Sequence, residues 1–351
     1  MSNIQINPYN FAAAAVGSWK ELDRTITASP LSDFSVGSLP DMEYYMVLTN
    51  ILGKNNSGVN WQMRMGNPTI DSGNNYAQRY SVNGGTDTTS TNRSNIQNGT
   101  NPTDQNQLNV AYISNLSAQE KLMQSQGVDQ MTAGATNPPS RGEYVGKWAN
   151  TSNPISIIGA TTGSGSYTFD TGSEMVVLGW DTTDTHTTAD NFWQELASVT
   201  TTGAATSISS GTFTAKKYLW FQTYLPSGQS AIVDNIGIQF NGDTGSNYAR
   251  RYSNNGGTDG TDTAVPNFDV SRSGTEGDFV NAFIVNNSGN EKLITANSIS
   301  VGNSLGAGSA PLRTEVVGKC VNTSSQITSM VVNTNADSIP AGWTVKVWGS
   351  D

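Results

Sequence analysis

The chain has 351 residues, of which 13% are charged, and its formal net charge at pH 7 is −10. This length favours two domains, and the 35% hydrophobic content excludes a disordered chain. The acidic balance without a Lys and Arg cluster argues against a nucleic-acid binder, and the single cysteine excludes an intramolecular disulfide framework.

The first eighteen residues are expected to form a docking arm. They lack the charged start and long apolar centre of a signal peptide, and no apolar run in the chain is long enough to span a membrane. We therefore expect synthesis in a cytosol. Terminal arms are ordered mainly when something ties them down. The apolar residues that we expect to dock are Ile4, Ile6, Tyr9 and Phe11. An extra strand or cap on the first domain is the alternative.

Residues 75–87, NYAQRYSVNGGTD, recur at residues 247–259 as NYARRYSNNGGTD, identical at eleven of thirteen positions. Flanking segments recur at offsets from 170 (Val177 to Val347) to 174 (Trp19 to Trp193). They include EKL at Glu120 and Glu291, and RGEYVGKWANTS from Arg141 against RTEVVGKCVNTS from Arg313. So long a period indicates a duplicated domain rather than a solenoid. We predict an arm at 1–18, a first domain at 19–181, a linker at 182–192 and a second domain at 193–351.

Each copy is predicted to consist of strands. Residues 44–52 and 218–225 are apolar runs rich in aromatic and β-branched side chains, and residues 59–65 and 234–240 alternate apolar with polar. The 36 Gly, together with abundant Ser, Thr and Asn, favour turns between them, and no long helix is indicated. The sequence therefore predicts an all-β protein of two tandem homologous β-sandwich or jelly-roll domains.

The recurring motif is predicted to be structural. Alternation along a strand puts Tyr76, Gln78 and Tyr80 on one face and Arg79 on the other. The Asn-Gly pairs at 83–84 and 255–256 suit the positive φ of a hairpin turn. We expect each Arg to pair with a carboxylate, Glu143 and Glu315 being the candidates; a role at a ligand face is the alternative. The motif residues are Tyr76, Arg79, Tyr80, Gly84, Gly85, Tyr248, Arg251, Tyr252, Gly256 and Gly257.

No catalytic set and no cofactor site are predicted. The single histidine, His186, lies in a Thr-rich segment and is interpreted as a solvated linker residue rather than a triad member. Ser304 lies in a GNSLG sequence but lacks the helix that follows a nucleophile elbow. Cys320 stands where the first copy has Trp148, which indicates a core position.

Loop carboxylates are weak candidates for calcium ligands. Oxygen-rich loops on a sandwich can hold calcium, although Asp in turns usually bonds its own backbone. The recurring candidates are Asp71, Asp87, Asp243 and Asp259. Glycan binding through exposed aromatic and amide side chains is a further hypothesis, although packing can account for most of the eight Trp.

Residues 216–229, KKYLWFQTYLPSGQ, and residues 240–259, FNGDTGSNYARRYSNNGGTD, resemble repeat domains in virion proteins of tailed bacteriophages, especially marine and freshwater ones. The NYAxRYSxNGGTD stretch is the most specific part, and the resemblance covers nearly all of each copy. It implies a virion component with jelly-roll-like domains. It implies no catalytic residues.

We therefore expect a non-enzymatic structural protein of a bacteriophage particle, exposed on its surface as a capsid decoration (cement) protein. The alternatives are a tail-fibre or receptor-binding protein that recognises host glycans, and a double jelly-roll major capsid protein. The expected partners are other virion proteins of the shell or tail, and no nucleic acid or membrane. A homotrimer is expected because three two-domain chains give six similar domains, which match a threefold or sixfold site.

Overall fold

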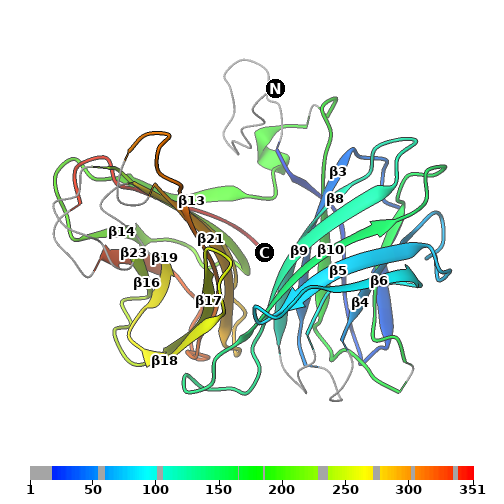
Figure 1. The fold of residues 1–351 in the computed structure, drawn as a ribbon, viewed down its shortest axis with the longest axis horizontal. Coiled ribbons are helices and arrows are strands. Elements are labelled where there is room, and N and C mark those ends of the chain that lie inside the picture. Colours follow the sequence, from blue (N-terminus) through cyan, green and yellow to red (C-terminus); the bar gives the residue numbers. More distant parts are fainter. Residues whose placement is uncertain are drawn as a thin grey trace. The chain divides into compact units, whose positions relative to one another are not determined.

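The computed structural model describes residues 18–53, 60–100, 106–164, 166–184, 186–227, 236–271, 277–301, 305–334 and 339–351. Their regular secondary structure consists of strands, apart from one 3-10 helix at Thr188–Asp190 (Figure 1). Over the same residues no helix has the length and hydrophobicity of a membrane span. The all-β prediction is confirmed. The predicted docking residues Ile4, Ile6, Tyr9 and Phe11, and also Ser304, lie outside the described residues.

The first repeat supplies the strands of two sheets. They are β1 (Lys20–Ile26), β2 (Asp33–Val36), β3 (Tyr44–Ile51), β4 (Gln62–Gly66), β5 (Tyr76–Val82), β6 (Thr88–Arg93), β7 (Ile96–Gln97), β8 (Gln107–Ser114), β9 (Lys121–Asp129), β10 (Ser140–Trp148), β11 (Ile157–Thr161) and β12 (Glu174–Trp180). The eight-stranded sheet has the order β1-β12-β3-β8-β9-β10-β5-β6, and the four-stranded sheet has the order β2-β11-β4-β7.

The second repeat reproduces this order strand for strand. Its strands are β13 (Gln194–Thr200), β14 (Ser207–Thr212), β15 (Tyr218–Leu225), β16 (Ile236–Phe240), β17 (Tyr248–Asn254), β18 (Gly260–Val265), β19 (Phe268–Ser271), β20 (Asp278–Val285), β21 (Lys292–Ser300), β22 (Leu312–Cys320), β23 (Ser329–Thr334) and β24 (Thr344–Ser350). The sheet orders are β13-β24-β15-β20-β21-β22-β17-β18 and β14-β23-β16-β19. The predicted tandem homologous sandwiches are confirmed.

The strand pairing within each repeat is nested, as in a jelly roll. In the first repeat β1 pairs with β12 and β3 with β8 in the large sheet, whereas β2 pairs with β11 and β4 with β7 in the small sheet. Successive nested pairs thus alternate between the two sheets, which is the arrangement of an eight-stranded jelly roll. The strands β9, β10, β5 and β6 extend the large sheet beyond β8.

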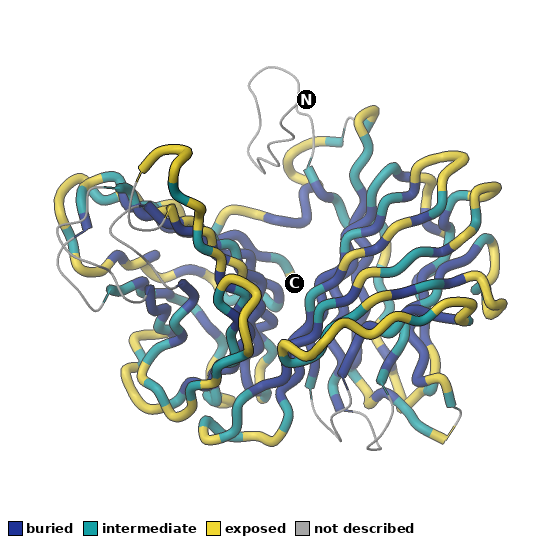
Figure 2. The backbone as a smooth tube through the Cα atoms, in the orientation of Figure 1, coloured by how far each residue is buried: buried dark blue, intermediate teal, exposed yellow. Residues whose placement is uncertain are grey.

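Alternating burial along the strands builds the cores between the sheets. In β4, Met63 and Met65 are fully buried while Arg64 between them is partly exposed. Buried positions run through the strands and exposed positions gather at the connecting turns (Figure 2). Fully buried tryptophans anchor both cores, Trp61 and Trp148 in the first and Trp343 in the second.

The chain forms two compact units whose limits depart from the repeat boundaries at two places. The first unit comprises the described residues up to 82, then 86–127 and 142–194. The second comprises residues 83–85, 128–141 and 195–351. The segment between β9 and β10 of the first repeat therefore belongs to the second unit. Residues 182–192, predicted as a linker, belong to the first.

Candidate functional site

The buried tyrosine of the repeated motif binds backbone in both copies. The Tyr76 hydroxyl donates to the carbonyl of Met65 at 2.8 Å and accepts from the Met65 N–H at 3.0 Å. The Tyr248 hydroxyl accepts from the N–H of Phe240 at 2.9 Å. Burial raises the pKa of both phenols above their ordinary value. The tyrosines therefore hold the motif strand onto the opposite sheet, as the structural interpretation predicts.

The Asn-Gly turns have the predicted backbone. Asn83 and Gly84 have φ of 53° and 68°, and Asn255 and Gly256 have φ of 52° and 71°. Two successive positive φ angles are those of a tight hairpin turn that favours Asn-Gly. The strands on either side, β5 with β6 and β17 with β18, pair antiparallel. Gly85 and Gly257 follow these turns, and the hairpin prediction is confirmed.

The second tyrosines of the motif are half-buried and pack differently in the two copies. Tyr80 stacks on Tyr144 with ring centroids 6.3 Å apart. Tyr252 instead lies under the guanidinium of Arg250, 4.6 Å from the ring centroid. Arg250 pairs with Asp262 at 2.6 Å and stands where the first copy has Gln78. The second tyrosine of the motif thus packs against a different residue in each sandwich.

The calcium candidate Asp71 is bound by protein donors. Its carboxylate accepts from the Gly73 N–H, the Asn75 side-chain amide and the indole N–H of Trp148, each at 2.8 Å. Partial burial opposes ionisation, but these hydrogen bonds outweigh it and hold the pKa of Asp71 below its ordinary value of 3.8. Asp243 binds Gly245 and Asn247 in the same way. Cys320, the counterpart of Trp148, lies in the second core as predicted, and burial raises the pKa of its thiol to about 11.

Trp148→Phe should lower the free energy of unfolding by about 1.5–3 kcal/mol near neutral pH, because it removes a hydrogen bond to a charged carboxylate. The folded pKa of Asp71 is depressed, so this stabilisation is present above the ordinary pKa and is lost as pH falls through the folded pKa. Urea titrations between neutral pH and pH 3 measure the difference. In an Asp71→Asn background the pH dependence of the difference should disappear. A difference that does not change with pH in the native background would contradict the assignment.

The motif arginines have different partners from those predicted. Arg79 pairs with Asp87 at 3.2 Å, and both side chains are about half exposed. Arg251 is partly buried, and its Nε donates to the carbonyl of Pro139 at 2.9 Å. Burial lowers the pKa of Arg251, with Arg141 nearby acting in the same direction and Asp259 opposing both. Glu143 and Glu315 as partners were therefore a wrong prediction, since Asp87 and a loop carbonyl lie closer in space.

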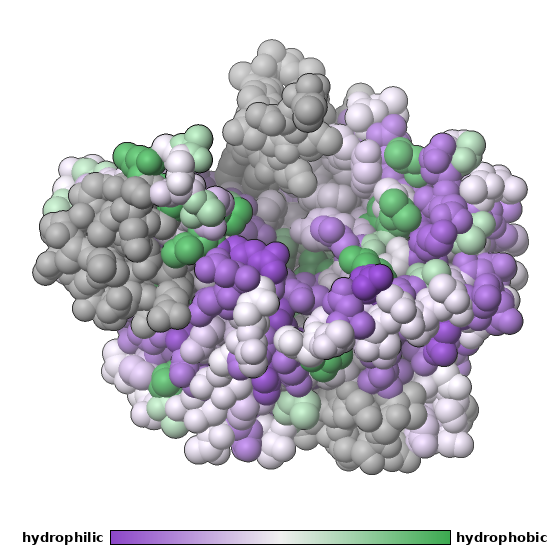
Figure 3. All heavy atoms as spheres, viewed as in Figure 1, coloured by the Kyte–Doolittle hydropathy of each residue, from purple (hydrophilic) through white to green (hydrophobic). Residues whose placement is uncertain are grey.

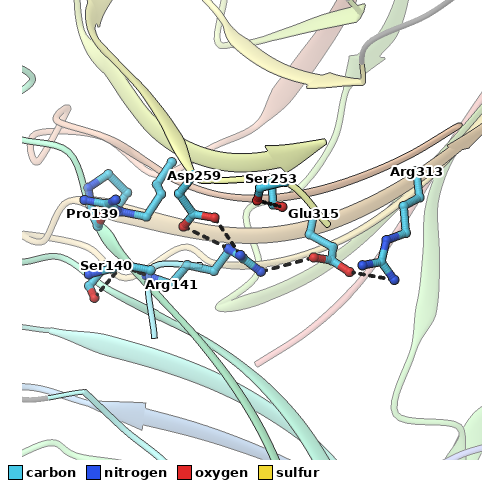
Figure 4. A network of polar contacts seen from close by, with 10 residues as sticks. Pro139, Ser140, Arg141, Ser253, Asp259, Arg313 and Glu315 are labelled. Carbon is cyan, nitrogen blue, oxygen red and sulfur yellow. Dashed lines mark hydrogen bonds and ion pairs between the residues drawn. The ribbon is translucent and has the colours of Figure 1, made fainter. Parts of the chain in front are cut away.

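The site that the sequence did not reveal is a buried charge network around Arg141 (Figure 4). The Arg141 guanidinium binds Asp259 through Nη2 at 2.7 Å and Nε at 3.3 Å, and binds Glu315 through Nη1 at 3.2 Å. The side chains of Arg141 and Asp259 are 3% and 2% exposed. Arg313 reaches the other oxygen of Glu315 at 3.6 Å. A fork of this kind, with two carboxylates on one guanidinium, fixes both position and orientation.

A second polar cluster holds the same 128–141 segment. The fully buried ammonium of Lys319 donates to the carbonyls of Gln130 and Thr132 at 3.2 and 2.6 Å. Glu291, 3.5 Å from Lys319, accepts from the N–H of Gly134 at 2.7 Å. Burial lowers the pKa of Lys319, while Glu291 opposes that shift. The segment is thus held at both of its ends by contacts within the second unit.

His186 is not a solvated linker residue, so that interpretation was wrong. Its side chain is 8% exposed, with Nδ1 3.0 Å from a carboxylate oxygen of Asp184. Its Nε2 lies 2.9 Å from the side-chain oxygen of Asn191, which also accepts from the Ser18 N–H at 2.8 Å. The segment folds back onto the start of the first repeat because Lys20 also pairs with Asp184.

The two cores also differ in chemistry. Asn98 in the first sandwich is fully buried, and neither atom of its side-chain amide has a hydrogen-bond partner among the described residues. The corresponding residue of the second sandwich is Val270, part of an apolar core. The repeats therefore share a topology without sharing all of their interior contacts.

Asp71, Arg141 and Lys319 all bind other groups of the same chain. Over these residues no group of three or more His, Cys, Asp or Glu side chains could hold a metal ion. Asp87 and Asp259, the remaining calcium candidates, pair with arginines. The surface seen in Figure 3 is mostly hydrophilic or neutral, with hydrophobic residues in small groups.

No protein-family model matches the chain, and no curated protein matches it. Among solved structures, mouse laminin alpha1 domains LG4-5 are 10% identical with a TM-score of 0.18, over 99% of this chain and 92% of that one. The LG1-3 region of the laminin alpha2 chain is 8% identical with a TM-score of 0.22, over 95% and 63%. The STIV MCP is 8% identical with a TM-score of 0.16, over 94% and 96%. These scores carry no argument about function. The strand order itself defines the class, a tandem pair of β-sandwiches with jelly-roll topology.

Proposed function

We propose that this chain is a non-enzymatic structural component of a bacteriophage virion, exposed on the particle surface as a capsid decoration protein. It is made in the host cytoplasm and joins the shell as a homo-oligomer, which we propose to be a trimer. The proposal rests first on the NYAxRYSxNGGTD repeat and its resemblance to virion repeat domains.

The observation that carries the proposal is the use made of the polar residues of the motif. Tyr76, Asp71 and their counterparts bind backbone and neighbouring side chains of the same sandwich. Arg141, Asp259 and Glu315 bind one segment of the chain to another. These charged groups stabilise the fold and join segments of the chain. Such a use of charge suits a structural protein that binds its neighbours in a particle.

A double jelly-roll major capsid protein is the second candidate, favoured by the nested pairing of strands in both repeats. Deletion of the gene separates the two. A decoration protein should leave complete shells that fall apart more readily on heating, whereas a coat protein should leave no shells.

Particle composition tests the class itself. Mass spectrometry of purified particles should find the chain in many copies per particle, and cryo-EM should place it on the outer surface of the head. A few copies confined to the tail tip would support a receptor-binding protein instead. Absence of the chain from purified particles would overturn the proposal.

A further inference from the structure

The segment that joins β9 to β10 has a close counterpart in the second repeat. Residues 134–143, GATNPPSRGE, correspond to residues 306–315, GAGSAPLRTE, at the constant offset of 172. Gly134 and Gly306 have φ of 97° and 94°. Each accepts through its carbonyl from the N–H three residues later, at 3.2 and 3.3 Å. The two loops therefore share a turn as well as a sequence.

The environments of the two loops differ completely. Arg141 at the end of the first loop is 3% exposed, and it binds Asp259 and Glu315 within the second unit. The side chain of its counterpart Arg313 is 59% exposed and pairs with Glu315 of its own strand at 3.6 Å. Leu305, at the start of the second loop, is 65% exposed. The second loop thus presents the same groups as the first, but to solvent.

The outer sheet faces of the two repeats also differ in exposure: the face of the second repeat is covered, and the equivalent face of the first repeat is exposed. On the outer face of the second repeat, Leu293 and Val317 are fully buried, although neither belongs to the sandwich core. Their counterparts in the first repeat, Leu122 and Val145, are 56% and 48% exposed. The covered face is the one whose Lys319 and Glu291 bind the 128–141 segment.

The charged groups of that face recur in the first repeat. Glu120 and Lys147, the counterparts of Glu291 and Lys319, form an exposed pair at 2.7 Å. Arg79 and Asp87, the counterparts of Arg251 and Asp259, form another. Asn92 shares with its counterpart Ala264 a φ of 50°, and the Ala264 N–H donates to the carbonyl of Ala135 at 2.8 Å. The first repeat therefore keeps the receiving face but has no loop bound there among the described residues.

We propose that the loop Leu305–Arg313 of one molecule binds the outer face of β9, β10 and β5 in a second copy of this chain, repeating the contact that the 128–141 segment makes within the second unit. Arg313 would then bind Asp87 and Glu143, and Arg79 would bind the carbonyl of Pro311. The Asn92 N–H would donate to the carbonyl of Ala307, and Leu122 and Val145 would be covered.

Such a contact is heterologous, because a loop on one molecule meets a sheet face on the next. Heterologous contacts close into rings or extend as chains. Every molecule then carries one loop and one face, and each can be blocked separately. The inference does not depend on a role in a virion, since it concerns the purified chain alone.

The test uses two charge reversals with opposite defects. R313E blocks the loop and leaves the face intact, whereas D87K blocks the face and leaves the loop intact. Light scattering and sedimentation over a wide concentration range should show self-association of the native chain. Each variant should weaken it by roughly tenfold to a hundredfold, the scale of a lost interfacial charge pair. Mixed together, the two variants should regain the association of the native chain, because Arg313 meets Asp87 at one junction and the introduced Glu meets the introduced Lys at the other. K346E and E195K, charge reversals in β24 and β13, are the matched controls and should associate as the native chain does.

Cysteine cross-linking gives an independent measurement that does not depend on charge. N92C mixed with A307C should form a covalent dimer on oxidation, because the intrachain counterparts Ala264 and Ala135 are joined by a backbone hydrogen bond. The variant A135C/A264C should close a disulfide within one chain and stay the size of the native protein. A native chain that remains monomeric at every concentration, or a mixture that neither dimerises nor cross-links, would overturn the proposal. Neither result would bear on the particle experiments above.

Discussion

Arg141→Ala should lower the free energy of unfolding by about 3–5 kcal/mol, the cost of removing one partner from a buried charge cluster. The Asp259 side chain is 2% exposed and would lose the guanidinium that now binds it through two nitrogens. Glu315, 17% exposed, would lose its nearer arginine and retain Arg313 at 3.6 Å. The effect is large because the Asp259 carboxylate lies away from water.

The counterpart substitution Arg313→Ala is a matched control within the same chain. Arg313 has the same place in the repeat, but its pair with Glu315 is exposed, and exposed pairs contribute about 0–1 kcal/mol. Urea unfolding followed by tryptophan fluorescence measures both variants, with dilute protein so that self-association does not contribute. Equal losses of stability in the two variants would show that the Arg141 cluster contributes no more to the free energy of unfolding than the exposed Arg313 pair.

Gly318→Ala should also be strongly destabilising, by about 1–3 kcal/mol or more, because it overpacks a filled core. A Cβ at Gly318 would lie 1.6 Å from a ring carbon of Phe268, which is itself 1% exposed. The ring cannot move aside without opening the contact between β22 and β19. Thermal unfolding should show a lower Tm and a broader transition.

Two other glycines provide comparisons for the loss of stability expected at Gly318. At Gly146, the counterpart in the first repeat, the nearest atoms are side-chain carbons of Ile96 at 2.7 Å, farther away than the 1.6 Å at Gly318. Gly146→Ala should therefore cost less than Gly318→Ala. A Cβ at Gly308 would meet no atom within 4 Å, so Gly308→Ala should leave the Tm nearly unchanged. If Gly318→Ala were as mild as Gly308→Ala, the packing of Phe268 against β22 would be contradicted.

The repeat made much of the fold predictable from the sequence. Alternation along residues 76–82 and the Asn83-Gly84 pair gave the strand, its buried tyrosine and the turn correctly, because each depends on neighbours in the chain. The nested order of the sheets was not predictable in detail. It depends on pairings such as β1 with β12, which join residues far apart in sequence.

The charge network was missed for a physical reason. Arg141 and Arg313 occupy the same place in the two copies, yet one is buried and the other exposed. Their surroundings come from other segments of the chain, so the local sequence holds no signal of the difference. The sequence indicates Asp259 only as a calcium ligand, and Glu315 only as a partner of the motif arginine. Because acidic residues and arginines recur together in both repeats, the sequence indicates ion pairs, but it does not indicate which residues pair with each other.

The assignment of residues 128–141 to the second unit has a consequence for the order of events during synthesis on the ribosome. Nascent domains generally fold from the N-terminus, and the first jelly roll can close once β12 has emerged to pair with β1 and β3. The segment carrying Arg141 is then already synthesised when Asp259, Glu291 and Lys319 are translated. The second sandwich therefore folds with this segment already available to bind, whereas the first sandwich has no equivalent segment bound to it among the described residues. A chain stopped after residue 181 would hold Arg141 with neither Asp259 nor Glu315 to neutralise it.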